Sequence, residues 1–370
     1  IVLILSCVLG WCVAKLASKA KNKNNVTMVF SLVFMGVYYL LFDKAQEIIN
    51  ALITNVVILG QSVKKSLYPL YMFGKIGEGD ILSAIIYAVI TIGILSLVYR
   101  LLARSFITIV SASKNSRKAV YKEKNIKRKS QIWAVAGKEF KRFTSSAAYM
   151  LNCAFGSIGM IIISVILIIK RDFLQTFNQV VMSSEGGEGT LMLMNQFIPI
   201  ISVALICFLI SANDIVVPSV SLEGKNIWIM QSLPIEPWTV LKGKLITHLL
   251  VTGFSVVIIC ISLLFALNVS IVQLLTIYLA VFTYLIFMSL FDLFLAVKMP
   301  DLTWTNEMTP VKQGGNIFIA LFGGMGFSVL LAGVFFLFGT GIGCVAYLLI
   351  ASVIFVILSV ILYLWIKNKG

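Results

Sequence analysis

Long apolar stretches recur through the chain, and they restrict its possible folds more than any other feature. A helix rises about 1.5 Å per residue, so roughly 20 apolar residues cross the ~30 Å hydrocarbon core of a bilayer. In lipid the backbone must satisfy its own hydrogen bonds, which such stretches do as helices. We therefore predict an all-α fold, a polytopic transmembrane helical bundle of about nine spans, at residues 1–14, 26–42, 81–102, 149–169, 196–213, 244–267, 271–297, 316–338 and 342–366.

The composition excludes an ordinary soluble domain. Hydrophobic residues make up 59% of the chain and charged residues 12%, whereas soluble domains are about half apolar and about a quarter charged. The net charge of +15 raises the possibility of nucleic-acid binding. However, the basic residues lie in the gaps beside apolar stretches, where they meet anionic lipid. We expect the lipid bilayer, and no nucleic acid, as a partner.

Cysteine and histidine give no sign of a metal site. The six cysteines all lie in apolar stretches without a C-x-x-C pair, which is typical of small buried apolar side chains. The single histidine, His248, has no acidic cluster beside it in the sequence. We therefore expect no metal ligands and no catalytic triad.

Residues 45–63 are long enough to span a membrane, but Glu47, Asn50 and Asn55 recur on one helical face. A crossing here would put the two basic gaps near the start of the chain on opposite sides, against the positive-inside rule. We predict an external half-helix.

The gaps divide the chain into three parts. Residues 1–102 form a partial first transmembrane half, with three spans plus the half-helix at 45–63. Residues 103–131 form a basic cytoplasmic linker. Residues 132–370 form a second transmembrane half, with an interfacial helix followed by six spans. We expect the chain to be a fragment of a duplicated protein with two six-span halves.

The start of the second half has an amphipathic pattern that is typical of a helix lying in the membrane interface, although a helical lead-in to the next span fits equally well. Its apolar positions are Ile132, Val135, Ala136, Phe140 and Phe143, and its charged positions are Lys138, Glu139, Lys141 and Arg142.

The loop from Asn213 to Lys244 is unusual for a connecting segment. Its apolar residues suggest a docking surface, or alternatively a loop that lies on the membrane interface. Two prolines stiffen its middle, and charged residues surround the apolar ones. The apolar residues are Trp228, Ile229, Met230 and Leu233, the prolines Pro234 and Pro237, and the charged residues Glu223, Lys225 and Glu236.

The segment EGKNIWIMQSLPIEPWTVLKGK, residues 223–244, resembles the loop between the second and third helices of type-2 ABC exporter permeases. The matching features are the acid Glu223, the helical stretch Ile227–Gln231, the Leu233–Pro234 pair and the closing Gly243–Lys244 pair.

Two further segments carry the same resemblance. AGKEFKRFTSSAAYMLN is similar to the elbow helix of these permeases, with Lys138, Glu139 and Arg142 at its charged positions. Residues Asp301 to Gly315 resemble a cytoplasmic loop of a Firmicutes-like branch. The resemblance covers residues 131–370 well and 1–102 weakly. The chain departs from the family in the external loop before the last span, where FGTG is too short for the usual re-entrant helices.

The resemblance implies a permease of the bacterial cytoplasmic membrane, driven by a separate, dimeric cytosolic ABC ATPase that binds ATP. A phosphate-binding loop requires G-x-x-x-x-G-K-[ST], and no Gly-Lys pair of this chain matches it. We expect no catalytic residue and no cofactor in this chain. The implied coupling loop consists of Glu223, Lys225, Trp228, Met230, Leu233, Pro234 and Pro237, and the implied elbow helix presents Lys138, Glu139, Phe140 and Arg142.

Asp292 is the only acid well inside a predicted span. It is either a carboxylate of the transport path, or an acid near the interface that reaches water or pairs with a lysine such as Lys298. The first interpretation keeps an ion-coupled secondary transporter open as an alternative. A membrane-embedded transferase acting on a lipid-linked substrate is a further alternative.

Small residues recur every fourth position at Ala320, Gly324, Ser328 and Ala332. This pattern predicts a face on which another helix approaches closely.

Overall fold

The computed structural model consists of helices and their connections, without a strand in the described part. The described residues are 2–19, 27–38, 42, 44–45, 68–114, 130–169, 187–267, 269–339 and 341–369. The chain divides into two compact units, Ile1–Asn125 and Ile126–Gly370. The prediction of an all-α polytopic bundle is confirmed.

Helices occupy all nine predicted spans. In the described part, five helices are long and apolar enough to cross a membrane, and a bent pair adds a sixth. The other three predicted spans hold shorter apolar helices, at Ser6–Lys15, Thr27–Tyr38 and Gln196–Ser211.

The first unit is built around α5 (Ile81–Lys114), against which α1 (Val2–Lys19) and α4 (Tyr68–Gly77) pack. Trp11 Nε1 of α1 donates a hydrogen bond to Ser105 Oγ of α5 at 2.6 Å. Asp80 caps α5 by accepting bonds from Leu82 N at 3.1 Å and Ser83 Oγ at 2.7 Å.

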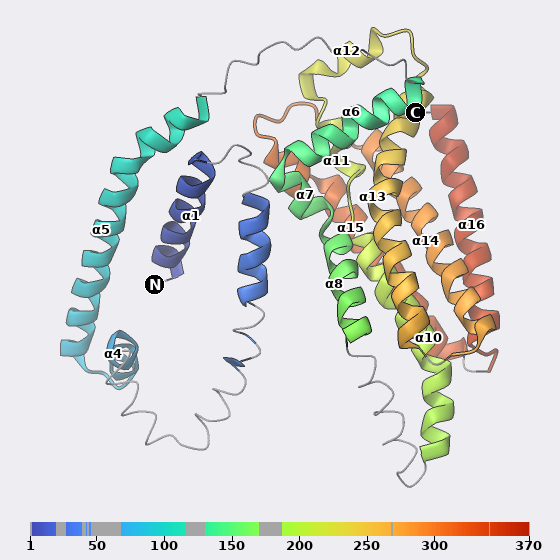
Figure 1. The fold of residues 1–370 in the computed structure, drawn as a ribbon, viewed down its shortest axis with the longest axis horizontal. Helices are drawn as coiled ribbons and strands as arrows, with labels where there is room; N and C mark the ends of the chain where they lie inside the picture. The colour runs from blue at the N-terminus through green and yellow to red at the C-terminus, as the bar shows by residue number, and fades with distance from the viewer. Residues whose placement is uncertain are drawn as a thin grey trace. The chain divides into compact units, whose positions relative to one another are not determined.

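The second unit is a bundle with α6 lying across one end, beside α12 and the C-terminus (Figure 1). We call this the α6 end. Its elements are α6 (Gln131–Ser145), α7 (Ala147–Cys153), α8 (Phe155–Ile169), α10 (Gly187–Ser211), α11 (Val217–Ser221), η1 (Gly224–Asn226), α12 (Ile227–Gln231), α13 (Pro237–Ala266), α14 (Ile271–Lys298), η2 (Thr309–Gln313), α15 (Gly315–Val334), η3 (Phe335–Gly339) and α16 (Cys344–Lys369).

Helix α14 is the centre of the second unit, with neighbours α10, α13, α15 and α16. Tyr284 of α14 is fully buried, and its hydroxyl donates to Gly324 O of α15 at 2.8 Å and lies 2.7 Å from Ser211 Oγ of α10. A Cβ atom on Gly324 would lie 2.5 Å from Met288 Cε. The small-residue face on α15 therefore serves close helix packing, as predicted.

The span predicted at 149–169 is a bent pair, α7 and α8, with 65° between the two helices. The two residues that follow α10 occupy the break: Asn213 Oδ1 accepts a bond from Ser157 N at 2.8 Å, and Ala212 O accepts one from Gly156 N at 3.4 Å. Backbone donors that the break exposes are thus satisfied by the connection that follows α10, as an apolar environment requires.

Several predicted boundaries differ from the observed ones. Helix α5 continues to Lys114, so the first part of the linker predicted at 103–131 is helical, and α13 begins at Pro237 rather than at 244. Most of the half-helix predicted at 45–63 and linker residues 115–129 lie outside the described residues.

Candidate functional site

The loop between α10 and α13 is folded into short helices that place its side chains. Helix α11 ends at Ser221, the single turn η1 follows Glu223, and α12 covers Ile227–Gln231. Gly224 has φ +54°, a left-handed conformation that glycine adopts without strain. The predicted helical stretch therefore coincides with α12.

Five charged side chains meet where the loop contacts α6 and α13, and we call them the charge cluster. They are Lys138, Glu139 and Arg142 of α6, Glu223 of the loop and Lys244 of α13. Glu223 Oε1 lies 3.0 Å from Lys138 Nζ, 3.3 Å from Arg142 Nη1 and 3.0 Å from Lys244 Nζ. Lys244 Nζ also lies 3.2 Å from Glu139 Oε1. The cluster joins three stretches of sequence through ionic contacts.

Two backbone carbonyls complete the cluster. Lys244 Nζ donates to Ser219 O at 2.8 Å, and Arg142 Nη2 donates to Leu222 O at 3.1 Å. Burial by itself raises the pKa of Glu223, but the charges of Lys244, Arg142 and Lys138 outweigh it and lower the pKa to about 2. Glu223 is therefore ionised in the folded protein at neutral pH.

The predicted Gly243–Lys244 pair has a structural reason. A Cβ atom on Gly243 would lie 2.6 Å from Val135 Cγ1, so glycine allows α6 to cross directly against α13. Thr247, one turn later, donates to Ala136 O of α6 at 3.1 Å. The glycine brings the helices together, and Lys244 then reaches the acids beside it.

The loop between α14 and α15 forms hydrogen bonds to the loop between α10 and α13. Trp304 Nε1 donates to Ser221 O, and Asp301 N donates to Ser221 Oγ at 3.0 Å. The indole ring of Trp304 also covers Gly224. Residues 301–315 and 223–244, which carry the two loop resemblances, are thus in contact. The sequence did not single out Ser221 or Trp304.

Helix α12 and the turn after it present apolar side chains on the surface. Trp228 is 61% exposed, Ile229 46% and Leu233 43%. Met230 is half-buried and instead lines a cavity of about 340 Å³ beneath the helix. Glu223 and Lys244 of the charge cluster line the same cavity. The loop therefore combines an exposed apolar surface with a hollow that ends at an ion pair.

The remaining residues predicted for the site lie apart from the cluster. Lys225 and Pro234 are exposed on the loop, and Phe140 is exposed on α6. Pro237 is exposed at the start of α13, where it borders the cavity beneath α12. The charged face predicted for α6 is wrong at one position, because Glu139 is only 4% exposed and lies on the buried face opposite Lys244.

Asp292 is 1% exposed, and Lys298 lies over the Phe294 ring at 5.2 Å. The interpretation of Asp292 as an acid that reaches water or pairs with that lysine is therefore wrong. It interacts electrostatically with Asp214, which is 4% exposed. In each carboxylate, Oδ1 is buried without a hydrogen-bond partner among the described residues. Burial raises the pKa of Asp214 to about 8.

Two polar residues near span entrances, Asn152 and His248, form no hydrogen bond to another helix within the described residues. Asn152 Nδ2 donates to Ala148 O within α7 at 2.7 Å. His248 is fully buried, and within the described residues neither ring nitrogen has a hydrogen-bond partner.

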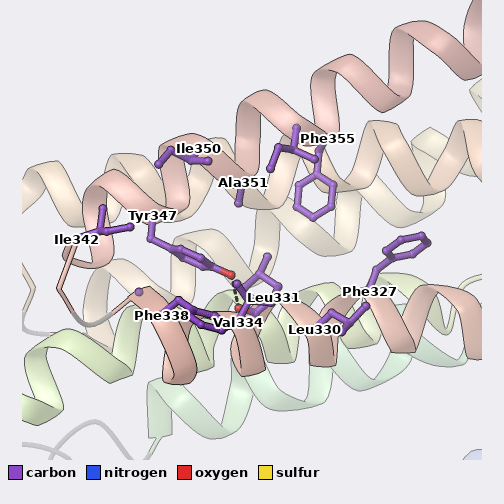
Figure 2. A pocket seen from close by; sticks show the side chains of 12 residues that line it. Phe327, Leu330, Leu331, Val334, Phe338, Ile342, Tyr347, Ile350, Ala351 and Phe355 are labelled. Carbon is purple, nitrogen blue, oxygen red and sulfur yellow. Dashed lines mark hydrogen bonds between the residues drawn. The ribbon is translucent and has the colours of Figure 1, made fainter.

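A second hollow of about 360 Å³ lies between α15, η3 and α16, far from the charge cluster in sequence. Figure 2 shows its lining, including Phe327, Leu330, Val334, Phe338 and Tyr347. The Tyr347 hydroxyl donates to Leu331 O at 2.6 Å, so the one hydroxyl of the lining is used within the protein. The pocket is suited to apolar groups.

The helices, their apolar surfaces and the basic gaps define a multi-pass α-helical membrane protein. The chain matches the model of a family described as "Membrane protein of 12 TMs" over residues 1–367. It therefore belongs to this family of polytopic membrane proteins. No curated protein and no solved structure matches the chain.

Proposed function

We propose that this chain is the membrane permease subunit of an ATP-driven ABC exporter in a bacterial cytoplasmic membrane. A separate cytosolic ATPase, acting as a dimer, would bind and hydrolyse ATP. The observation that carries the proposal is the charge cluster, which joins the elbow-like helix α6, the coupling-like loop and α13. The twelve spans in the family's description also equal two six-span halves.

The proposed mechanism follows from these contacts. The ATPase would bind the exposed side of α12 through Trp228 and Leu233, with one of its apolar side chains in the cavity beside Met230. A displacement of α12 would pass through Glu223 to Lys138 on α6 and Lys244 on α13. Because α13 runs from Pro237 to Ala266, a push at the loop reaches the full depth of the bundle.

The test is to purify the tagged full chain from its native membranes in mild detergent and to assay ATP hydrolysis with and without its co-purifying proteins. We expect a stoichiometric partner with a phosphate-binding loop, hydrolysis by the complex, and none by the chain alone. Hydrolysis by the isolated chain, or the lack of any such partner in active membranes, would contradict the proposal.

A second candidate is an ion-coupled secondary transporter, which the buried Asp214 and Asp292 carboxylates favour. Transport into sealed vesicles separates the two functions. An exporter continues when an ionophore collapses the proton and sodium gradients and stops without ATP, whereas a secondary transporter does the reverse.

A further inference from the structure

Helix α6 has a second surface that the charge cluster does not use. Its buried residues, among them Val135, Glu139 and Phe143, pack toward α13 and the loop. Trp133 and Phe140 remain 55% and 46% exposed. They border a hollow of about 520 Å³ that we call the interfacial groove, lined by Ser130, Trp133, Ala136, Gly137, Phe140 and, from α13, Leu250.

The groove continues into an apolar track along α13. Leu250 is 50% exposed, and the exposed residues Phe254, Val257 and Ile261 follow it at helical spacing. In a helix that crosses a bilayer, such a stripe faces hydrocarbon. The groove therefore begins beside an interfacial helix and leads into the acyl region.

The charges at its mouth are positive. On α6, Lys141 is exposed and is not a member of the charge cluster, whereas the single acid of the helix, Glu139, is buried. The sequence directly before Ser130 is Lys127-Arg128-Lys129. Basic pockets between membrane helices attract anionic headgroups, and tryptophan favours the headgroup level of the bilayer.

We propose that the interfacial groove binds an anionic phospholipid from the leaflet at the α6 end. Its phosphate lies near Lys141, its glycerol region lies between Trp133 and Phe140, and one acyl chain passes Leu250 along α13. A protein segment would not need the apolar track, and a lipid without net charge would gain nothing from Lys141. This inference is independent of the proposed transport function.

Gly137 offers a way to fill the groove. A Cβ atom at this position meets no atom within 4 Å, and Gly137 lines the hollow, so Gly137→Leu is the substitution chosen to fill it. Gly333 on α15 is equally open, and Gly333→Leu is the matched control. Lys141→Gln removes the charge assigned to the phosphate.

The experiment reconstitutes the full chain in phosphatidylcholine bilayers that contain an equal minor fraction of brominated phosphatidylglycerol or brominated phosphatidylcholine. Bromine quenches tryptophan fluorescence at contact, and the difference between the wild type and Trp133→Phe isolates Trp133. We expect the anionic lipid to be preferred about fivefold at Trp133, the size of one lysine–lipid interaction near a membrane surface. Gly137→Leu should abolish the preference, Lys141→Gln should reduce it, and Gly333→Leu should retain it.

Equal quenching by the two lipids would overturn the proposal, because the groove would then be ordinary bilayer-facing surface. A lack of quenching at Trp133 would overturn it too, and would favour a protein occupant outside the membrane. Retention of the preference in Gly137→Leu would place the lipid elsewhere. Gly137→Ala, a smaller change, should give an intermediate preference if Gly137→Leu does not fold.

Discussion

Lys244 has the least access to water of the three cations in the charge cluster, at 3% side-chain exposure against 41% for Lys138 and 31% for Arg142. A buried charge is stable only when its partners remain in place, so the removal of one member leaves the others desolvated and unpaired. Lys244 contacts both acids and a carbonyl, and it is therefore the residue on which the cluster depends most.

We predict that Lys244→Met lowers the free energy of unfolding by about 3–5 kcal/mol, because Glu139 and Glu223 lose a shared buried partner. Lys242→Met is the control. Lys242 is half-buried and lies 5.4 Å from the centre of the Trp238 ring, and such a contact is worth about 0.5–1 kcal/mol. Thermal unfolding of the detergent-solubilised proteins measures the difference, and equal losses in the two variants would contradict the ionic role.

Asp214 gives a second prediction, through pH. Its pKa is about 8 in the folded protein, against 3.8 as the ordinary value. Between these values the folded state holds a proton that the unfolded state has lost, so the stability contribution falls as the pH rises and is gone above about pH 8. Asp214→Asn should reduce this slope in melting temperatures between about pH 5 and about pH 9, and the buried carboxyl of Asp292, which remains, accounts for a residual slope. Glu236→Gln, at an exposed carboxyl, should not change it.

Glu223, Lys138, Glu139 and Arg142 could be predicted as site residues from the sequence, because the segments that hold them resemble segments of known permeases. Their ion pairs could not be predicted, because Glu223 and Lys138 are 85 residues apart in the sequence and ionic partners depend on how the helices cross. The burial of Asp214 could not be predicted from the sequence, because an acid directly after an apolar stretch usually reaches water. Only the fold shows that the connection after α10 is buried.

At the scale of elements, the crossing of α6 over α13 creates the candidate site. The amphipathic pattern predicted α6, and the loop motif predicted α12. The break between α7 and α8 had no sequence signal, because its backbone donors are satisfied by Ala212 and Asn213, which follow α10 and are distant in the sequence. The start of α13 was also predicted too late, at residue 244. The helix extends beyond the apolar residues and begins at Pro237, a residue that suits the first turn of a helix.

We predict that Gly243→Ala separates α6 from α13 and destabilises the second unit by about 1–3 kcal/mol, because the new methyl group would lie 2.6 Å from Val135 Cγ1. Gly253→Ala on the same helix meets Leu285 Cδ2 at 3.8 Å, an ordinary contact. That variant should be neutral or slightly more stable, because alanine favours a helix more than glycine does. Unfolding of the two variants in detergent distinguishes them, and equal stability would refute the close crossing.

At the scale of the whole molecule, the apolar stretches predicted the all-α membrane bundle because lipid leaves the backbone few alternatives. The positive-inside rule further predicts on which side of the membrane each loop lies. It predicts that the loops holding α12 and η2 share the cytoplasmic side with the basic linker, and that the connection from α15 to α16 lies outside.

Cysteine labelling tests this topology. On a cysteine-free background, we expect Ser232→Cys, in the loop after α12, to react with an impermeant reagent only from the cytoplasmic side. Gly341→Cys, between η3 and α16, should react only from outside. Reaction of the two positions from the same side would contradict the map.

The central claim is that the loop from Glu223 to Lys244 couples this chain to its ATPase, and the direct measurement is the affinity of that ATPase for membrane-inserted variants. Loss of a buried aromatic anchor costs about 2 kcal/mol, or about 30-fold in affinity, whereas a rim charge contributes little. Trp228→Ala and Leu233→Asp should therefore release the ATPase and end its stimulated hydrolysis, whereas Lys225→Ala should have a mild effect. Undiminished binding and hydrolysis with both Trp228→Ala and Leu233→Asp would contradict the coupling role.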